Sequence, residues 1–218
     1  MRVVPKTQPP GNVYLSLSTD GTLASYGEAS YVSAYAGLTN FTAEFWFKLI
    51  AFQGDWDRLF DHNQQTGFSI TRNQGNNSLQ FRTMDQAVNS STLSFSGWTH
   101  IACVRNGSTG YIYINGALDS SGGINSNAFT TTQPIGIGQN RTNGSERVAG
   151  KFADVRLWNV ARTGTQIANS YNTHLVGNES GLIANWKFIQ GNTLADSSAT
   201  NNPITVGANA SFVSDVPY

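Results

Sequence analysis

The sequence predicts an all-β fold, a sandwich of two antiparallel sheets with one short helix, on three observations. Short runs rich in β-branched and aromatic residues recur at close spacing, separated by Asn-Gly and other Gly-rich turns. Only residues 163–172 have the spacing of apolar residues that is typical of a helix. Aromatic residues make up 11% of the 218 residues and charged residues only 12%, against about 25% in an average soluble domain. The chain can therefore build a large core, and its turns are rich in Gly, Ser, Thr and Asn.

The expected strands are predicted from alternation and turn spacing. Residues 13–18 alternate apolar and polar side chains, which is the period of a half-buried strand. In 41–52 the odd-numbered residues from Phe41 to Leu49 share one face and Trp46 lies on the other, so both faces of this strand are expected to be covered. The remaining strands are expected at 31–35, 57–62, 67–72, 78–84, 92–95, 98–105, 110–115, 134–138, 148–160, 182–189 and 204–206.

The helix at 163–172 has a start signal and one apolar stripe. Thr163 can cap its N-terminus, and Ile167 and Tyr171 lie one turn apart on the same face. A helix this short cannot form a domain of its own. We expect it to close one end of the sandwich.

The chain is predicted to hold one domain and one arm. It has no mid-chain linker and no internal repeat, so residues 13–218 are predicted as a single domain. A Pro-rich segment, 1–12, precedes it and is expected to run extended, because the residue before a proline is biased away from the helical region. The arm is expected to lie on its own domain, on a second copy in a homo-oligomer, or on a neighbour in a particle.

Several of the expected strands carry a series of motifs. They are FTAEFWFK at 41–48, GWTHIA at 97–102, YING at 113–116 and GKFADVRLWN at 150–159. Their order and spacing resemble laminin-G-like, concanavalin A-like lectin and glucanase domains, in a branch found in bacteria and phages. The resemblance implies a jelly-roll sandwich over about residues 13–213. It implies no particular ligand, because this fold hosts many functions.

Charge and hydropathy exclude two kinds of partner. The 13 basic and 13 acidic residues give a net charge of zero, and no run of Lys or Arg occurs, so no nucleic-acid partner is expected. No apolar stretch approaches the roughly 20 residues that span a bilayer, so no membrane span is expected. The N-terminus lacks the apolar core of a signal peptide. We expect an extracellular, surface-associated or virion location, reached by another route or as a mature segment.

Glycoside hydrolysis is not predicted. A retaining glycosidase needs two carboxylates about 5–5.5 Å apart, which alternate positions on one strand can supply. None of the four glutamates has an acidic residue two positions away. The pair Asp55 and Asp57 has this spacing, but its Gly-Asp-Trp context indicates a loop. The chain is therefore not expected to be an enzyme.

The resemblance implies a structural calcium ion. Asp154 matches an acidic residue that carries calcium in related jelly rolls, and calcium takes oxygen ligands from carboxylates and from backbone carbonyls at turns. Asp20 is expected to join it if the terminal strands pair, and Asp196 is a third candidate ligand. The alternative is that Asp154 pairs with Arg156 and that the other two are ordinary turn residues.

A lectin site needs an aromatic ring that stacks on the apolar face of a sugar and polar groups that bind its hydroxyls. Trp56 is the predicted stacking residue, because charged residues flank it; the alternative is that it covers one edge of the core. The residues expected to hydrogen-bond the ligand are Asp57, Asn63, Arg72, Arg82, Asn140 and Arg141. The tryptophans expected in the core are Trp46, Trp98, Trp158 and Trp186.

Three classes of function fit these observations. The first, which we favour, is a lectin-like binding module that recognises a glycan or a protein surface. The second is a structural subunit of a phage particle or surface appendage, because a surface with few charges is tolerated in an assembly. The third, a glycoside hydrolase, has the least support.

Overall fold

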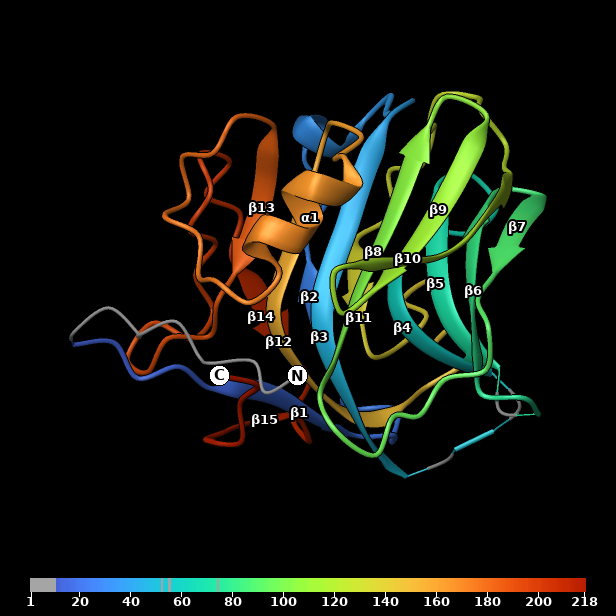
Figure 1. Ribbon diagram of the computed structural model, residues 1–218. Helices are drawn as coiled ribbons and strands as arrows, with labels where there is room; N and C mark the ends of the chain where they lie inside the picture. Colours follow the sequence, from blue (N-terminus) through green and yellow to red (C-terminus); the bar gives the residue numbers. More distant parts are fainter. Residues whose placement is uncertain (1–10, 52, 55, 74) are drawn as a thin grey trace.

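The computed structural model describes residues 11–51, 53–54, 56–73 and 75–218, and it confirms the predicted sandwich of two antiparallel sheets (Figure 1). The predicted arm at 1–12 lies outside the described residues, except for Gly11 and Asn12. Among the described residues, no helix is both long enough and apolar enough to cross a membrane.

Eight strands form the first sheet. They are β1 (Ser16–Asp20), β3 (Phe41–Ala51), β8 (Thr99–Asn106), β9 (Thr109–Ile114), β10 (Ala117–Gly123), β12 (Ala149–Trp158), β13 (Leu182–Trp186) and β15 (Ser211–Val213). Their hydrogen-bonded order is β10-β9-β8-β3-β12-β1-β15, and β13 pairs with β12 off this path. Strands that are distant in sequence are neighbours here, which is the topology of a jelly roll rather than a simple meander.

Seven strands form the second sheet. They are β2 (Gly27–Ala29), β4 (Trp56–His62), β5 (Phe68–Asn73), β6 (Ser78–Thr83), β7 (Gln86–Asn89), β11 (Ile135–Ile137) and β14 (Ile204–Val206). Their order is β14-β2-β11-β4-β5-β6-β7. Strands β4 to β7 follow one another along the chain, so half of this sheet is the predicted meander.

The core lies between the sheets and is rich in phenylalanine. Phe41 on β3 contacts Phe68 on β5 with ring centroids 4.8 Å apart. Phe45 on β3 meets Phe60 on β4 edge-on at 5.8 Å. Such aromatic pairs stabilise a core beyond the area that they bury. The alternating strands therefore direct their apolar residues inward, as the sequence predicts.

The predicted core tryptophans divide into two groups. Trp186 is fully buried, and Trp46 and Trp158 are buried as well. The prediction that Trp98 lies in the core is wrong, because its side chain is only half-buried. It immediately precedes β8, where the chain has not yet entered the sheet.

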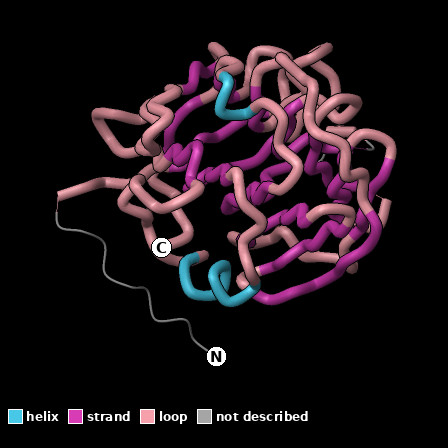
Figure 2. The backbone as a smooth tube through the Cα atoms, turned by 90° about the horizontal axis from the view of Figure 1, so that it is seen from above, coloured by secondary structure: helices cyan, strands magenta, loops and turns pink. Residues whose placement is uncertain are grey.

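The helix α1 (Gly164–Ser170) lies on the outer face of the eight-stranded sheet (Figure 1) and at the margin of the molecule in Figure 2. Thr163 is its N-cap, as predicted. The Thr163 hydroxyl accepts from the Gln166 backbone N–H (3.2 Å), and the Gln166 side chain accepts from the Thr163 N–H (2.8 Å). Ile167 is fully buried against outward-facing side chains of β8 and β9. The helix therefore covers one end of this face.

Two expected strands are wrong. Residues 31–35 contain a 3₁₀ helix, Ser33–Tyr35, instead of a strand. The side chain of Tyr35 is buried, and its hydroxyl accepts a hydrogen bond from the Asn202 amide (3.2 Å). This contact between distant segments overrides the local β propensity. Residues 92–95 form a loop, and β7 is the strand that pairs with β6.

Candidate binding groove

The outer face of the seven-stranded sheet is lined by polar side chains. In β5, Phe68 and Ile70 point into the core, so Ser69 and Thr71 point outward. Across the ladder, Thr71 lies between Arg58 of β4 and Gln80 of β6. The outer face of this sheet is therefore polar, in contrast to its inner face.

Three hollows follow one another on this face. The first, of about 290 Å³, is lined by Gly21, Gln53, Gly54, Trp56, Glu146 and Arg147. The second, of about 250 Å³, is lined by Trp56, Gln64, Thr71, Gln80, Arg82 and Glu146. The third, of about 510 Å³, is lined by Gln64, Gln65, Arg82, Met84, Asp85 and Asn125.

These hollows share walls. Trp56 and Glu146 belong to the first and the second, and Gln64 and Arg82 belong to the second and the third. Together they form one elongated depression, which we call the sheet groove. Each hollow alone is near or within the range of about 300–1,000 Å³ that is typical of small-molecule sites, so the groove offers room for a chain of linked units.

Trp56 is the aromatic residue of the groove. It opens β4 and its side chain is half-buried, so part of the ring is accessible from the groove. Arg82 has the same intermediate exposure, and it forms no ion pair with any described residue. Its Nε donates to Gln80 Oε1 in a long hydrogen bond of 3.4 Å. The guanidinium can therefore donate to a ligand.

The floor of the groove is built around Arg58. Its side chain is fully buried, forms ion pairs with Asp61 (3.2 Å) and Glu146, and donates to Gln64 Oε1 (3.0 Å). Burial raises the pKa of the Asp61 carboxyl to about 6, although Arg58 opposes the shift. Arg58 Nε and Ser69 Oγ are buried and have no hydrogen-bond partner among the described residues. These atoms are suited to ordered water.

The structure brings some of the predicted ligand-binding residues together. Trp56 and Arg82 line the groove. Asn140 is buried behind it and donates to Glu146 (3.3 Å), so it supports the wall. Asn63 is the turn residue after β4, with a positive φ of 55°, and its side chain accepts from the Gln65 N–H (3.0 Å). It shapes the loop that carries Gln64 and Gln65.

Three predicted residues lie elsewhere. Asp57 and Arg72 form a fully buried ion pair on the inner side of the sheet, opposite to the groove. The period of a strand explains the error, because each is one position away from an outward-facing residue. Arg141 lies beside β2, where its guanidinium is 3.5 Å from the Tyr26 ring centroid and bonded to Glu28 (2.6 Å).

Most residues that line the groove were missed by the sequence prediction, Thr71, Gln80, Gln64 and Glu146 among them. Thr71 and Gln80 follow from the alternation of β5 and β6, and the sequence signal for them was present. Gln64 lies in a turn, and Glu146 has a positive φ of 48° in the loop before β12. That loop reaches β4 through the Arg58 N–H, which donates to the Glu146 carbonyl (3.0 Å). No local pattern predicts this long-range contact.

The three aspartates proposed for calcium do not come together. Asp20 ends β1 opposite Ala149 at the start of β12, whereas Asp154 lies further along β12. Asp196 lies next to β13. No group of three or more His, Cys, Asp or Glu side chains that could hold a metal occurs in the described part of the chain. The prediction that these aspartates share one calcium site is therefore wrong.

The oxygens of two of these aspartates are already occupied. Asp196 accepts from the backbone N–H groups of Asn185, Ser198 and Asn202 and from the Ser198 hydroxyl, at 2.8 to 3.0 Å. This uses all of the roughly four lone-pair positions of a carboxylate. Asp154 pairs with Arg156, as the alternative proposed. Burial raises the pKa of the Asp154 carboxyl, but the opposing effect of Arg156 is stronger and leaves this pKa well below its usual range. These donor sets do not fit a calcium ion.

Comparisons with solved structures place the same fold in proteins of several kinds. A Bacteroides ovatus protein described as a candidate carbohydrate binder has a TM-score of 0.73 and 18% identity over 94% of this chain and 61% of its own. The chain therefore spans about 61% of that protein's length. The heptameric SAP-like pentraxin of Limulus polyphemus has a TM-score of 0.67 and 14% identity, covering 92% of this chain and 95% of its own.

A third neighbour was solved with an oligosaccharide. Domain 4 of an extracellular arabinanase from Geobacillus stearothermophilus, in complex with arabinotriose, has a TM-score of 0.56 and 17% identity over 71% of this chain and 75% of its own. No curated protein matches the sequence. A family model described as the concanavalin A-like lectin/glucanases superfamily matches residues 20–168. Because this match covers more than half of the chain, the protein belongs to the concanavalin A-like lectin/glucanases superfamily.

Proposed function

We propose that the protein is a non-catalytic binding module that recognises a glycan chain along the sheet groove. The observation that carries the proposal is the row of three connected hollows, with Trp56 between the first and the second. An elongated groove suits a linear chain of linked sugars better than a single compact ligand. The candidate carbohydrate binder of Bacteroides ovatus and the arabinanase domain in complex with arabinotriose support the proposal.

The chemistry of the groove matches that of a saccharide. The Trp56 ring offers an apolar face to the C–H groups of a sugar, while Gln64, Gln80 and Arg82 offer donors and acceptors to its hydroxyls. Most of these groups are uncharged, which suits a neutral ligand. The Arg82 guanidinium adds several N–H donors in a fixed geometry, and it forms no ion pair with a described residue.

Two carboxylates meet at Arg58, that of Glu146 in the groove wall and that of Asp61 beneath the groove, so catalysis needs a separate argument. Asp61 and Glu146 both form ion pairs with Arg58. A general acid has to reach the scissile oxygen, but Asp61 is only 1% exposed and lies beneath the groove. Its pKa of about 6 is explained by this burial. If the groove only binds a ligand, Asp61 and Glu146 are explained as ion-pair partners that hold Arg58 in place under it.

The assembly hypothesis rests on the low content of charged residues and on the arm at residues 1–12, of which the structure describes only Gly11 and Asn12. No structural observation favours it over glycan binding.

A glycan-array screen followed by titration calorimetry tests the proposal. We expect at least one oligosaccharide to bind, with arabinotriose as the first probe. Trp56→Ala and Arg82→Ala are each expected to weaken binding about tenfold or more, which corresponds to about 1.4 kcal/mol or more. The matched control is Tyr111→Ala, because Tyr111 is a half-buried aromatic residue on β9 of the other sheet and lines none of the three hollows.

Two results would contradict the proposal. One is an array with no ligand for the folded wild-type protein. The other is a ligand whose affinity is the same for the wild type, Trp56→Ala and Arg82→Ala. Melting temperatures of all variants show whether a lost affinity reflects lost folding.

A further inference from the structure

A second hollow lies on the opposite side of the molecule, on the outer face of the eight-stranded sheet. Its volume is about 330 Å³, and four of its lining side chains are aromatic. We call it the aromatic pocket and define it by Trp46, Trp98, Asn115, Tyr171, Asn172 and Tyr218. None of these residues lines the sheet groove, so the aromatic pocket is a separate feature.

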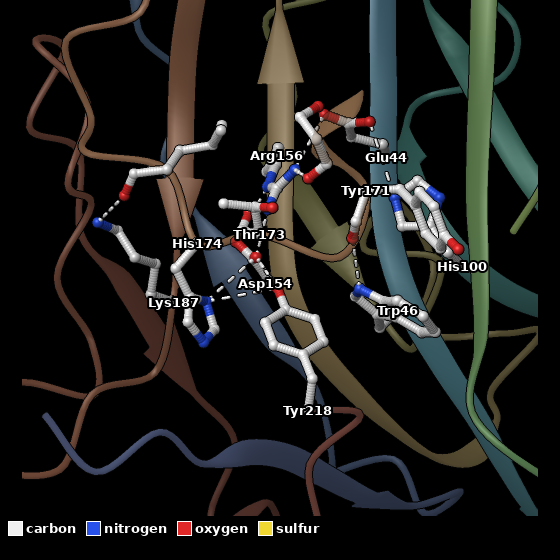
Figure 3. Close-up of polar contacts among 12 residues, drawn as sticks. Glu44, Trp46, His100, Asp154, Arg156, Tyr171, Thr173, His174, Lys187 and Tyr218 are labelled. Carbon is white, nitrogen blue, oxygen red and sulfur yellow. Dashed lines mark hydrogen bonds and ion pairs between the residues drawn. The ribbon is translucent and has the colours of Figure 1, made fainter. Parts of the chain in front are cut away.

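One wall of the pocket is a fixed cluster of rings. The Trp46 ring on β3 lies 5.9 Å from the Tyr171 ring and 5.7 Å from the Tyr218 ring. Trp46 Nε1 donates to the Tyr171 carbonyl (2.9 Å), an interaction drawn in Figure 3. Because its indole N–H is satisfied inside the protein, Trp46 presents carbon atoms to the pocket.

Trp98 also lines the pocket, and a carboxylate shared with two lysines holds its indole N–H. Trp98 Nε1 donates to Asp215 (3.0 Å). The same carboxylate binds Lys48 (2.9 Å) and Lys151 (2.6 Å), and these hydrogen bonds lower the pKa of Asp215 below its usual range. Trp98 is thereby oriented while its ring stays half-exposed. A ring that is already oriented loses little freedom when a ligand binds.

The Tyr218 ring is held in place by a hydrogen bond from its hydroxyl to Asp154. A β-bulge interrupts the β12–β3 pairing, and Asp154 lies in it with a φ of 48°. Asp154 accepts a hydrogen bond from the Tyr218 hydroxyl (2.5 Å) and pairs with Arg156 (Figure 3). The polar cluster beneath the pocket thus fixes the aromatic wall above it.

The charges around the pocket favour a neutral occupant. Asp154 is paired with Arg156, and Asp215 is shared by two lysines. Buried Glu44 pairs with Arg156 and Arg162, which lower its pKa despite the opposing effect of burial. No described carboxylate near the pocket lacks a cationic partner. A cation therefore has aromatic faces but no counter-charge here, and an anion finds only lysines that are already engaged.

We propose that the aromatic pocket is a second binding site, and that it takes one neutral sugar residue. The rings suit the C–H face of a sugar, and the amides of Asn115 and Asn172 suit its hydroxyls. Asn115 Oδ1 accepts from the His100 N–H (2.9 Å), so its NH₂ group is left to donate. The site does not rest on the proposed groove, and its position on the other sheet would let one molecule hold two glycans.

The test follows the indole N–H signals of the five tryptophans by NMR. The probes are the methyl glycosides of glucose, galactose, mannose and arabinose, each at about 10 mM, a concentration that fills most of a site with a millimolar dissociation constant. We expect at least one glycoside to shift the Trp46 and Trp98 signals to saturation. The shift should persist in Trp56→Ala, a groove variant. Trp98→Ala and Asn172→Ala should each weaken this binding, tenfold or more for Trp98→Ala.

Three outcomes would overturn the second site. In the first, no glycoside moves either signal. In the second, tetramethylammonium at the same concentration moves both signals and the glycosides do not, which would identify a cation cage. In the third, the affinity is unchanged in Trp98→Ala and Asn172→Ala. Because Trp56→Ala removes only groove binding, failure of one site is distinguishable from failure of the other.

Discussion

Arg58 is the residue on which the floor of the sheet groove depends. It is fully buried, and it is the only described cation within ion-pair distance of the buried Asp61. Arg58→Leu would leave that carboxylate buried without a partner. Removing one partner of a buried ion pair costs about 3–5 kcal/mol, so we expect urea unfolding at pH 7 to show a loss of this size.

The loss of stability in Arg58→Leu should depend on pH, whereas a loss caused only by a cavity would not. Protonating Asp61 removes the orphaned charge, so Arg58→Leu should lose less stability relative to wild type at pH 5 than at pH 7. The double variant Arg58→Leu/Asp61→Asn is the control, and it should be more stable than the single variant at pH 7. An equal loss at both pH values would show that the ion pair is not what Arg58 provides.

Individual side chains were predicted where alternation alone decides them. Trp46 was placed on the face opposite to the odd-numbered residues of β3, and the structure agrees. Asp57 and Arg72 were placed on the wrong face, because a shift by one residue reverses the direction of a side chain. The sequence also gave no signal for the exposure of Trp98, which depends on Asp215 far along the chain.

At the scale of elements, the predicted helix is the clearest test of local sequence rules. The capping box of Thr163 and Gln166 satisfies backbone N–H groups at the start of α1. Thr163→Ala is expected to cost about 1 kcal/mol of folding stability, whereas Thr163→Ser should be nearly neutral because Ser also caps. Thermal or urea unfolding measures both. Equal stability of the two variants would mean that the cap adds nothing beyond the burial of Ile167.

Long strands were easier to predict than short connecting segments. The aromatic-rich β3 and the motif-bearing β12 have many residues that obey one period. The 3₁₀ helix at Ser33–Tyr35 has three residues, and its conformation is selected by the contact of Tyr35 with Asn202. The bulge at Asp154 is equally invisible to alternation, yet it directs the polar cluster beneath the aromatic pocket.

At the scale of the whole molecule, the fold followed from the sequence but the location of the sites did not. The sheet groove combines β4, β5 and β6 with the loops that carry Gly21 and Glu146. The aromatic pocket combines β3 with residues 171–172 and 217–218. Each site joins segments that only the tertiary structure brings together. Trp56 and Arg82 were found because an aromatic residue flanked by charges and a cation in a predicted strand are visible in the local sequence.

Chelation tests whether a calcium ion contributes to the stability of the folded state. The carboxylates of Asp154 and Asp196 are already occupied by protein donors. We therefore expect EDTA to leave the melting temperature unchanged, because a ligand stabilises the fold only if it binds the folded state. A drop in melting temperature that disappears in Asp154→Asn would instead identify calcium at that residue.

The folding stability of the whole molecule should depend on pH through Asp61 and His62, whose effects on stability have opposite signs. Burial lowers the pKa of His62 to about 4 from 6.5 and raises the pKa of Asp61 to about 6 from 3.8. Between pH 4.5 and 6 the unfolded chain therefore binds the His62 proton and the folded protein does not, so His62 makes stability fall as pH falls. Asp61 binds its proton in the folded state, so it makes stability rise as pH falls.

Two variants separate these contributions. His62 lies among aromatic rings, Tyr35 and Phe68 among them, so His62→Phe is the conservative replacement. It should reduce the slope of unfolding free energy against pH by about 1.4 kcal/mol per pH unit near pH 5, and Asp61→Asn should increase it by a similar amount. Urea unfolding at several pH values between 4.5 and 6 measures both slopes, and any loss of stability common to all pH values cancels. If both variants change the slope in the same direction, at least one of the two buried groups does not titrate as its surroundings dictate.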